Sequence, residues 1–97
     1  MAVLIPPNTL PHEIAPANGR TFTLDELQTL VGGYIEALRA PGGRWLIVNE
    51  DGKRLTLPYN DAATTLMRGR LAGDDHIVGH AVLCSPLEAG EEEEETA

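Results

Sequence analysis

The chain has 97 residues, with 15 acidic side chains against seven basic ones and a formal net charge of -8 at pH 7. This length predicts one domain, and the scattered basic residues argue against nucleic-acid binding, which needs clustered Lys and Arg. No window approaches the roughly 18 apolar residues of a membrane helix, and a single cysteine, Cys84, excludes an intramolecular disulfide. We therefore expect a cytoplasmic protein that binds neither nucleic acid nor membrane.

The negative charge is concentrated near the C-terminus, where residues 91–95 are consecutive glutamates. Residues 1–87 carry nine acidic and seven basic side chains, so their net charge is only about -2. A run of like charges without large apolar side chains cannot bury enough surface to offset the entropy of ordering it. We expect a single domain over residues 1–87 and a disordered acidic tail over residues 88–97.

Two short strands are expected first, over Ala2–Ile5 and His12–Ile14. Prolines lie on both sides of the second segment, and proline cannot donate a hydrogen bond to a strand ladder. This pair therefore belongs at an edge of the sheet.

A helix should follow, because Thr23 and Glu26 have the spacing of a capping box and apolar residues then recur with helical periodicity up to Val31. Gly32 and Gly33 predict its end, since glycine adopts the left-handed C-terminal cap without a Cβ clash. A glycine pair at this position, after a helix, is not the arrangement of a phosphate loop, which precedes one.

The next segments predict an antiparallel meander of three strands, over residues 34–39, 44–49 and 53–57. Asp51 and Gly52, between the last two strands, are typical of a two-residue hairpin turn. The register set by that turn places Val48 opposite Leu55 and Leu46 opposite Leu57 on one apolar face.

A second short helix is expected over residues 61–70, with Asn60 as its N-cap. The last segment, residues 76–85, has apolar side chains at both odd and even positions, which is typical of a central strand covered on both faces. The whole pattern predicts an α+β domain: a mixed, mostly antiparallel sheet with a central three-strand meander and two short helices.

Five blocks of the chain carry a family resemblance: TLDELQ (23–28), VGGYIE (31–36), VNEDGK (48–53), LPYN (57–60) and IVG (77–79). In this order they resemble a family of small domains of unknown function that are encoded by bacteriophages, plasmids and bacterial genomes. The resemblance covers roughly residues 20–84. It implies a small intracellular domain carried by mobile elements, and it brings no established activity, catalytic residue or cofactor.

Residues with catalytic or metal-binding potential are few. On one strand, His76 and His80 would lie about 13 Å apart, too far to share a metal ion. His80 is expected to be a buried or half-buried histidine with a hydrogen-bond partner, with a pocket or pH-sensitive role as the alternative. Cys84 lies in an apolar run, where a thiol behaves as a small hydrophobic group. We expect no catalytic residue, no metal and no cofactor.

A set of polar and aromatic side chains should gather on the less apolar side or one end of the sheet: Tyr34, Glu36, Asn49, Arg54, Tyr59 and Asn60. The simplest interpretation is an exposed cross-strand ion pair between Glu36 and Arg44 or Arg54. The alternative is a recognition surface, because aromatic residues are favoured at interfaces.

The leading functional hypothesis is a non-catalytic binding module that self-associates or docks onto a host protein, since a body this small sits near the lower limit of independent stability. An alternative is a small-molecule binder or sponge with pockets between protomers. There, Tyr34, Arg54, Tyr59, Asn60 and Arg68 would hold a nucleotide-like ligand, because arginine suits phosphate and tyrosine stacks on a base. A minimal enzyme is a third alternative, which requires His80 beside Glu36 or an aspartate in a closed cleft.

Overall fold

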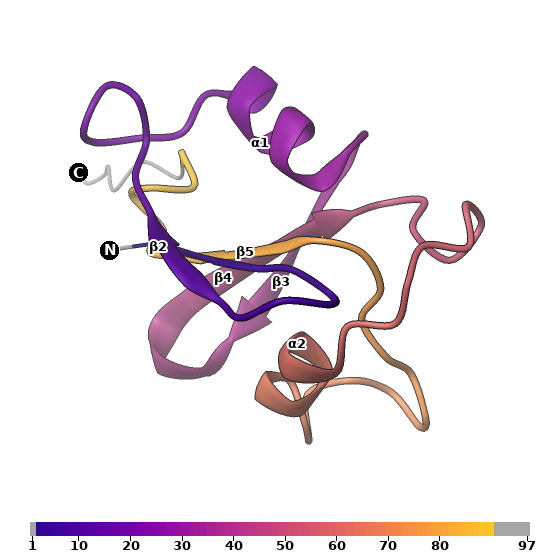
Figure 1. The fold of residues 1–97 in the computed structure, drawn as a ribbon. Coiled ribbons are helices and arrows are strands. Elements are labelled where there is room, and N and C mark those ends of the chain that lie inside the picture. The colour runs from indigo at the N-terminus through magenta and orange to yellow at the C-terminus, as the bar shows by residue number, and fades with distance from the viewer. Residues whose placement is uncertain (1, 91–97) are drawn as a thin grey trace.

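The computed structural model describes residues 2–90, which form one antiparallel sheet with a helix on each face (Figure 1). Five strands are hydrogen-bonded in the order β2-β1-β5-β4-β3. They are β1 (Ala2–Ile5), β2 (His12–Ile14), β3 (Ile35–Ala40), β4 (Arg44–Asn49) and β5 (Ala81–Cys84). The helices are α1 (Leu24–Val31), α2 (Asp61–Leu66) and the short 3-10 turn η1 (Pro41–Gly43). The five glutamates at 91–95 lie outside the described residues.

The last strand takes the central position, as its apolar pattern predicts. All four residues of β5 are buried, and β5 pairs with β1 on one side and with β4 on the other. It is shorter than the expected 76–85, because Gly79 adopts a left-handed φ of 76° and interrupts the extended backbone. The expected edge position of β2 is also confirmed.

The prediction of a three-strand meander is wrong for its last strand, residues 53–57. Residues 51–56 form consecutive turns, with the N–H of Leu55 donating to the carbonyl of Asp51 and the N–H of Leu57 donating to the carbonyl of Gly52. β5 occupies the place beside β4 that the third strand was expected to take. Gly52 lacks the positive φ that the expected hairpin turn requires, and the predicted pairs with Leu55 and Leu57 do not form. The sheet is antiparallel at every described pair, not mixed.

α1 has the predicted boundaries. Glu26 donates its backbone N–H to Thr23 Oγ1 at 3.1 Å and accepts the Thr23 N–H at 2.7 Å, so the capping box is complete. Gly32 has a φ of 83°, and its N–H donates to the carbonyl of Gln28, which closes the helix. The Glu26 carboxylate accepts hydrogen bonds from the backbone N–H of Thr23 and from that of Ala17. These bonds lower the pKa of Glu26.

α2 begins after Asn60, whose side chain accepts the N–H of Ala63 as predicted, but it ends at Leu66 instead of residue 70. Gly69 has a φ of 86°, which a continuing helix would not allow. Thr64 is also committed to a tertiary contact, since its Oγ1 accepts the N–H of Ile77 at 2.9 Å.

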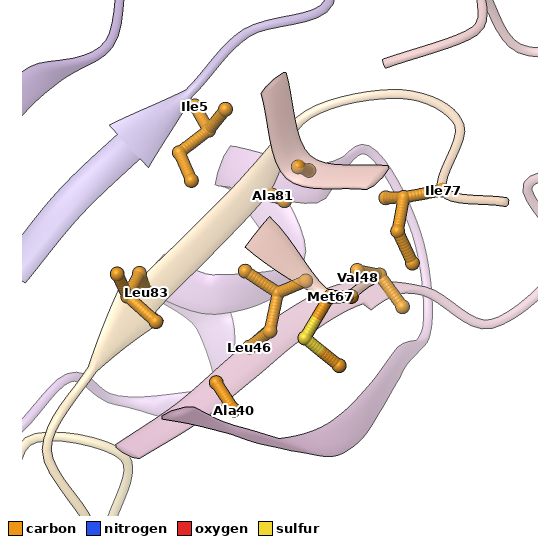
Figure 2. Packing of buried hydrophobic residues seen from close by; sticks show 9 residues of the cluster. Ile5, Ala40, Leu46, Val48, Met67, Ile77, Ala81 and Leu83 are labelled. Carbon is orange, nitrogen blue, oxygen red and sulfur yellow. The ribbon is translucent and has the colours of Figure 1, made fainter. Parts of the chain in front are cut away.

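Side-chain alternation divides the core into two layers. On the α2 face, Met67 packs with Leu46 and Val48 of β4 (Figure 2). On the α1 face, a second cluster gathers around Phe22 and Ile47. Residues 88–90, expected as the start of the tail, belong to the packed body: the Phe22 N–H donates to the Glu88 carbonyl, and Ala89 packs against the α1-face cluster.

Candidate functional site

β3 forms one edge of the sheet, with β4 as its neighbour on one side only. In an antiparallel pair, residues that exchange hydrogen bonds alternate with residues that do not. The N–H of Glu50 donates to the carbonyl of Tyr34 at 2.8 Å, so Tyr34 belongs to the bonded set, followed by residues 36, 38 and 40. The intervening residues Ile35, Ala37 and Arg39 therefore direct their N–H and C=O groups away from the sheet. No other strand within residues 2–90 pairs with them.

The two edges of the sheet differ in how well they are protected. β2 has three residues and lies between Pro11 and Pro16, and short edges bounded by proline resist pairing with another chain. β3 has six residues and no proline. Its exposed charges, Glu36 and Arg39, oppose indiscriminate pairing but leave the backbone groups accessible. β3 is thus the edge suited to accept an added strand.

A pocket of about 270 Å³ lies beside β3 on the α2 face. Glu36 and Leu38 of β3 form one wall, residues 49–54 form another, and residues 71 and 75–78 complete it. α2 is only six residues long, so it leaves this part of the sheet face uncovered. A second hollow of about 270 Å³ lies on the opposite face, lined by Ile35, Ala37 and Trp45 among others. Each face of the sheet therefore has an open space next to β3.

The charges around the α2-face pocket are unbalanced. Lys53 forms an ion pair with Asp75, and Arg54 lies 3.3 Å from Asp51. These pairs are substantially exposed and each contributes less than about 1 kcal/mol to stability. Two further carboxylates, Glu36 and Glu50, line the pocket without an ion pair in the described part of the chain. The carboxylates and the Lys and Arg side chains of the lining number four and two, which gives these six groups a net charge of -2.

One aromatic contact borders this pocket. The Tyr59 ring lies 5.2 Å from the His76 ring, centroid to centroid, and the two planes are inclined by 34°. Tyr59 also forms an isolated antiparallel bridge with Val78. The contact fixes His76, which lines the pocket, against the segment that precedes α2.

The structure brings some of the predicted site residues together and separates others. Glu36, Asn49 and Arg54 line the same pocket. Tyr34 is 68% exposed and lines a separate hollow with Asn49 and Leu55. Arg68 is exposed just beyond α2 and lines none of these spaces.

Two of the predicted site residues, Asn49 and Asn60, are buried and hold the fold together. Asn49 donates to the carbonyl of Val31 at 3.1 Å and accepts the N–H of Asp51 at 2.7 Å, which ties the end of α1 to the turn after β4. Asn60 is fully buried, and its side chain makes three hydrogen bonds with backbone groups.

The expectation that His80 is buried in a central strand is wrong. His80 is exposed and precedes β5, because the left-handed Gly79 delays the start of that strand. His76 and His80 consequently do not share a strand face. Within residues 2–90, no group of three or more His, Cys, Asp or Glu side chains is arranged to hold a metal ion.

Cys84 lies inside the α1-face cluster with no exposed surface. Burial, with a further contribution from the negative charge of Glu88, raises the pKa of its thiol to about 11. The thiol is therefore protonated at neutral pH, in agreement with packing as its role.

Sequence reasoning missed the contributions of Lys53, Asp75 and His76 to the pocket. Lys53 is far from the other two in the sequence, and no spacing rule connects them. The one available signal was the polar stretch Gly73-Asp74-Asp75, which is typical of a loop at a surface.

A model of the family described as Domain of unknown function (DUF3846) matches residues 1–96. The chain therefore belongs to this family. The match extends well beyond the residues 20–84 that carry the resemblance, and it includes β1 and β2. No curated protein and no solved structure matches the chain. None of the helices in residues 2–90 has the length and apolar character that crossing a membrane requires.

Proposed function

We propose that this chain is a non-catalytic protein-binding module, and that it binds an extended segment of a partner as an added strand along the free edge of β3. The observation that carries the proposal is the row of outward-directed backbone groups at Ile35, Ala37 and Arg39. In strand addition, such backbone groups supply affinity, and alternating side chains supply specificity.

The spaces on both faces of the sheet support this mode of binding. Side chains of an added strand alternate between the two faces. Those on the α2 face would lie next to Glu36, Leu38 and the pocket beyond them. Those on the other face would lie next to Ile35, Ala37 and the hollow near Trp45. A bound segment would thus meet a recess on each side.

Self-association through the same edge has less support. If the β3 strands of two copies paired symmetrically and antiparallel, residues on the same sheet face would lie opposite each other. One such pairing has the Ala37 residues of both copies at its centre. Glu36 would then face Leu38 of the second copy, and the two Glu36 residues would be diagonal neighbours with Cα atoms about 7–8 Å apart. Each chain also carries a net charge of -8. Charge repulsion therefore favours a different protein as the partner.

The alternative of a nucleotide-like ligand also has less support. Carboxylates outnumber cations around the α2-face pocket, and both cations are already paired with aspartates. Asn60, one of the residues assigned to that ligand, is fully buried. A phosphate would therefore meet net repulsion in this pocket.

We further propose, from the resemblance alone, that the module works in the cytoplasm of a bacterial host as an accessory protein of a bacteriophage or plasmid.

The test is selection of a displayed library of random peptides, long enough to span β3, on the immobilised full chain. Selected peptides are then measured against Ala37→Pro and Ala37→Thr. Proline removes one outward N–H and its ring obstructs the approaching strand, while the β4 side of the ladder keeps its donors. Threonine favours the extended backbone and keeps the N–H. Thermal melts establish that both variants fold.

The proposal expects selected peptides that bind the wild type and Ala37→Thr, with affinity for Ala37→Pro reduced about tenfold, the equivalent of about 1.4 kcal/mol. Failure to select any peptide, or equal binding to folded Ala37→Pro, would overturn it. Light scattering separates the competing case: a wild-type dimer that Ala37→Pro dissociates would assign the edge to a second copy.

A further inference from the structure

We propose that the partner segment carries a lysine or arginine opposite Glu36, with its cationic end in the α2-face pocket. This inference rests on the proposed strand addition at β3 and specifies the chemistry of the partner. It follows from the direction of the β3 backbone groups, the position of Glu36 and the charges that line the pocket.

The backbone pattern sets how closely a partner residue approaches Glu36. Because Ile35, Ala37 and Arg39 would exchange hydrogen bonds with the added strand, Glu36 falls in a non-hydrogen-bonded pair. The Cα atoms in such pairs are about 4.5 Å apart, closer than in bonded pairs, and directly opposed side chains share a face. The partner residue opposite Glu36 therefore projects on the α2 face, beside the pocket wall that Glu36 forms.

The pocket charge selects the side chain that fits there. The resident cations Lys53 and Arg54 are engaged by Asp75 and Asp51, whereas Glu36 and Glu50 have no ion pair in the described chain. An incoming ammonium or guanidinium would meet two carboxylates without displacing an existing pair. An acidic side chain at this position would meet repulsion, and an apolar one would desolvate carboxylates without compensation.

The neighbouring positions of the partner are apolar by the same reasoning. The residue opposite Leu38 shares the α2 face with an apolar, half-buried side chain. The residue opposite Ala37 lies on the other face, where the small alanine leaves the hollow beside Ile35 and Trp45 open. A basic residue followed or preceded by two apolar residues is thus the pattern that this edge fits.

The test uses three fluorescent synthetic peptides that have two valines on each side of one central residue and threonine elsewhere. They differ only in that central residue, which is lysine, glutamine or glutamate. Binding is measured by anisotropy on the full chain and on Glu36→Gln and Glu36→Lys. The matched controls are Glu13→Gln and Glu13→Lys, because Glu13 is an exposed glutamate on β2 at the other edge. Ala37→Pro reports whether binding uses the β3 edge.

We expect the lysine peptide to bind the wild type about two- to fivefold more tightly than the glutamine peptide, the range of a cross-strand charge pair. Glu36→Gln should abolish this preference and Glu36→Lys should shift it to the glutamate peptide, while the Glu13 variants keep the wild-type order. In about 1 M salt, where the Debye length is about 3 Å, the preference should shrink.

Two failures are distinguishable. If all three peptides bind the wild type equally and Ala37→Pro still weakens them, the basic preference is refuted and strand addition stands. If no peptide binds, or Ala37→Pro has no effect, strand addition itself is refuted and the basic preference with it.

Discussion

Asn60 should be among the most sensitive positions for folding, because one buried side chain joins three segments of the chain. Its Nδ2 donates to the carbonyl of Ile5 at 2.8 Å and to the carbonyl of Gly79 at 2.7 Å. Its Oδ1 accepts the N–H of Ala63 at 3.0 Å. β1, the approach to β5 and the start of α2 therefore depend on the same amide group.

The expected cost of Asn60→Ala can be built from these three bonds. Loss of an N-cap costs about 1 kcal/mol. Each buried carbonyl left without a donor costs about 1–3 kcal/mol. The sum is about 3–7 kcal/mol, and any relaxation of the backbone toward water reduces it. Small domains have a total stability of about 5–15 kcal/mol, so this variant should be close to unfolding.

Asn60→Asp separates the cap from the two donor bonds. The carboxylate keeps an acceptor for the N–H of Ala63 but turns an oxygen toward two carbonyls. Burial and those carbonyls disfavour the ionised form, so the folded-state pKa of this introduced carboxyl should rise above its unfolded value. The stability it retains should then be greatest at acidic pH and decline as pH rises. At neutral pH we expect it to be at least as destabilised as Asn60→Ala.

Urea unfolding followed by fluorescence measures these costs, because Trp45 is the single tryptophan and lies half-buried on β4. The matched control is Asn18→Ala. The Asn18 side chain also bonds to backbone groups, since its Oδ1 accepts the N–H of Arg20 at 2.8 Å and of Thr21 at 2.9 Å, but it lies in an exposed turn. We expect the control to lose about 1 kcal/mol or less. Equal losses for the two variants, or a loss below about 1 kcal/mol for Asn60→Ala, would refute the reasoning.

Three further outcomes are expected. Gly79→Ala should lower the free energy of unfolding by more than the about 1–2 kcal/mol of a left-handed backbone, because the added Cβ would lie 2.8 Å from Leu57 Cδ1. Gly19→Ala has open space around the added Cβ and should lose only that amount, so equal urea midpoints for the two variants would contradict this. Cys84, whose thiol pKa burial raises to about 11, should react with a thiol reagent only as the chain unfolds, and rapid labelling of the native protein would disprove it. The pKa of Glu26 is lowered, first by the hydrogen bond from the Thr23 backbone, so the ionised carboxylate stabilises the fold above the ordinary carboxyl pKa, and this stability is lost as pH falls through the folded-state pKa. Thermal melts should therefore show a weaker dependence on acid pH for Glu26→Gln than for the wild type.

The features that could be predicted from sequence are those set by neighbouring residues. Thr23 and Glu26 cap α1 because the capping box needs only a three-residue spacing. Gly32 ends the helix because glycine adopts a left-handed φ without a Cβ clash. The edge position of β2 follows from its flanking prolines, and the central position of β5 follows from its continuous apolar sequence. Each of these signals lies within one short segment.

The predictions that failed concern features that depend on contacts between segments distant in the sequence. Asp51 and Gly52 favour a hairpin locally, but Gly52 is buried against Val78, where an added Cβ would lie 2.8 Å from the valine Cγ2. The glycine therefore permits close packing, not a hairpin turn. Glu36 and Arg54 were identified as site residues because they are polar near a strand. Asp75 and His76, which line the same pocket, come from a distant loop that no local pattern links to them.

The failed third strand also explains why a pocket exists beside β3. A strand over residues 53–57 would have paired with β4 on the side away from β3. Because β5 holds that position, residues 51–56 instead form turns, and these turns place Lys53 in an ion pair with Asp75. The turns thereby wall the space next to Glu36 that α2 is too short to cover. The long-range pairing of β4 with β5 therefore has two consequences. It prevents the hairpin that Asp51 and Gly52 favour locally, and it leaves a recess beside the β3 edge for a partner side chain.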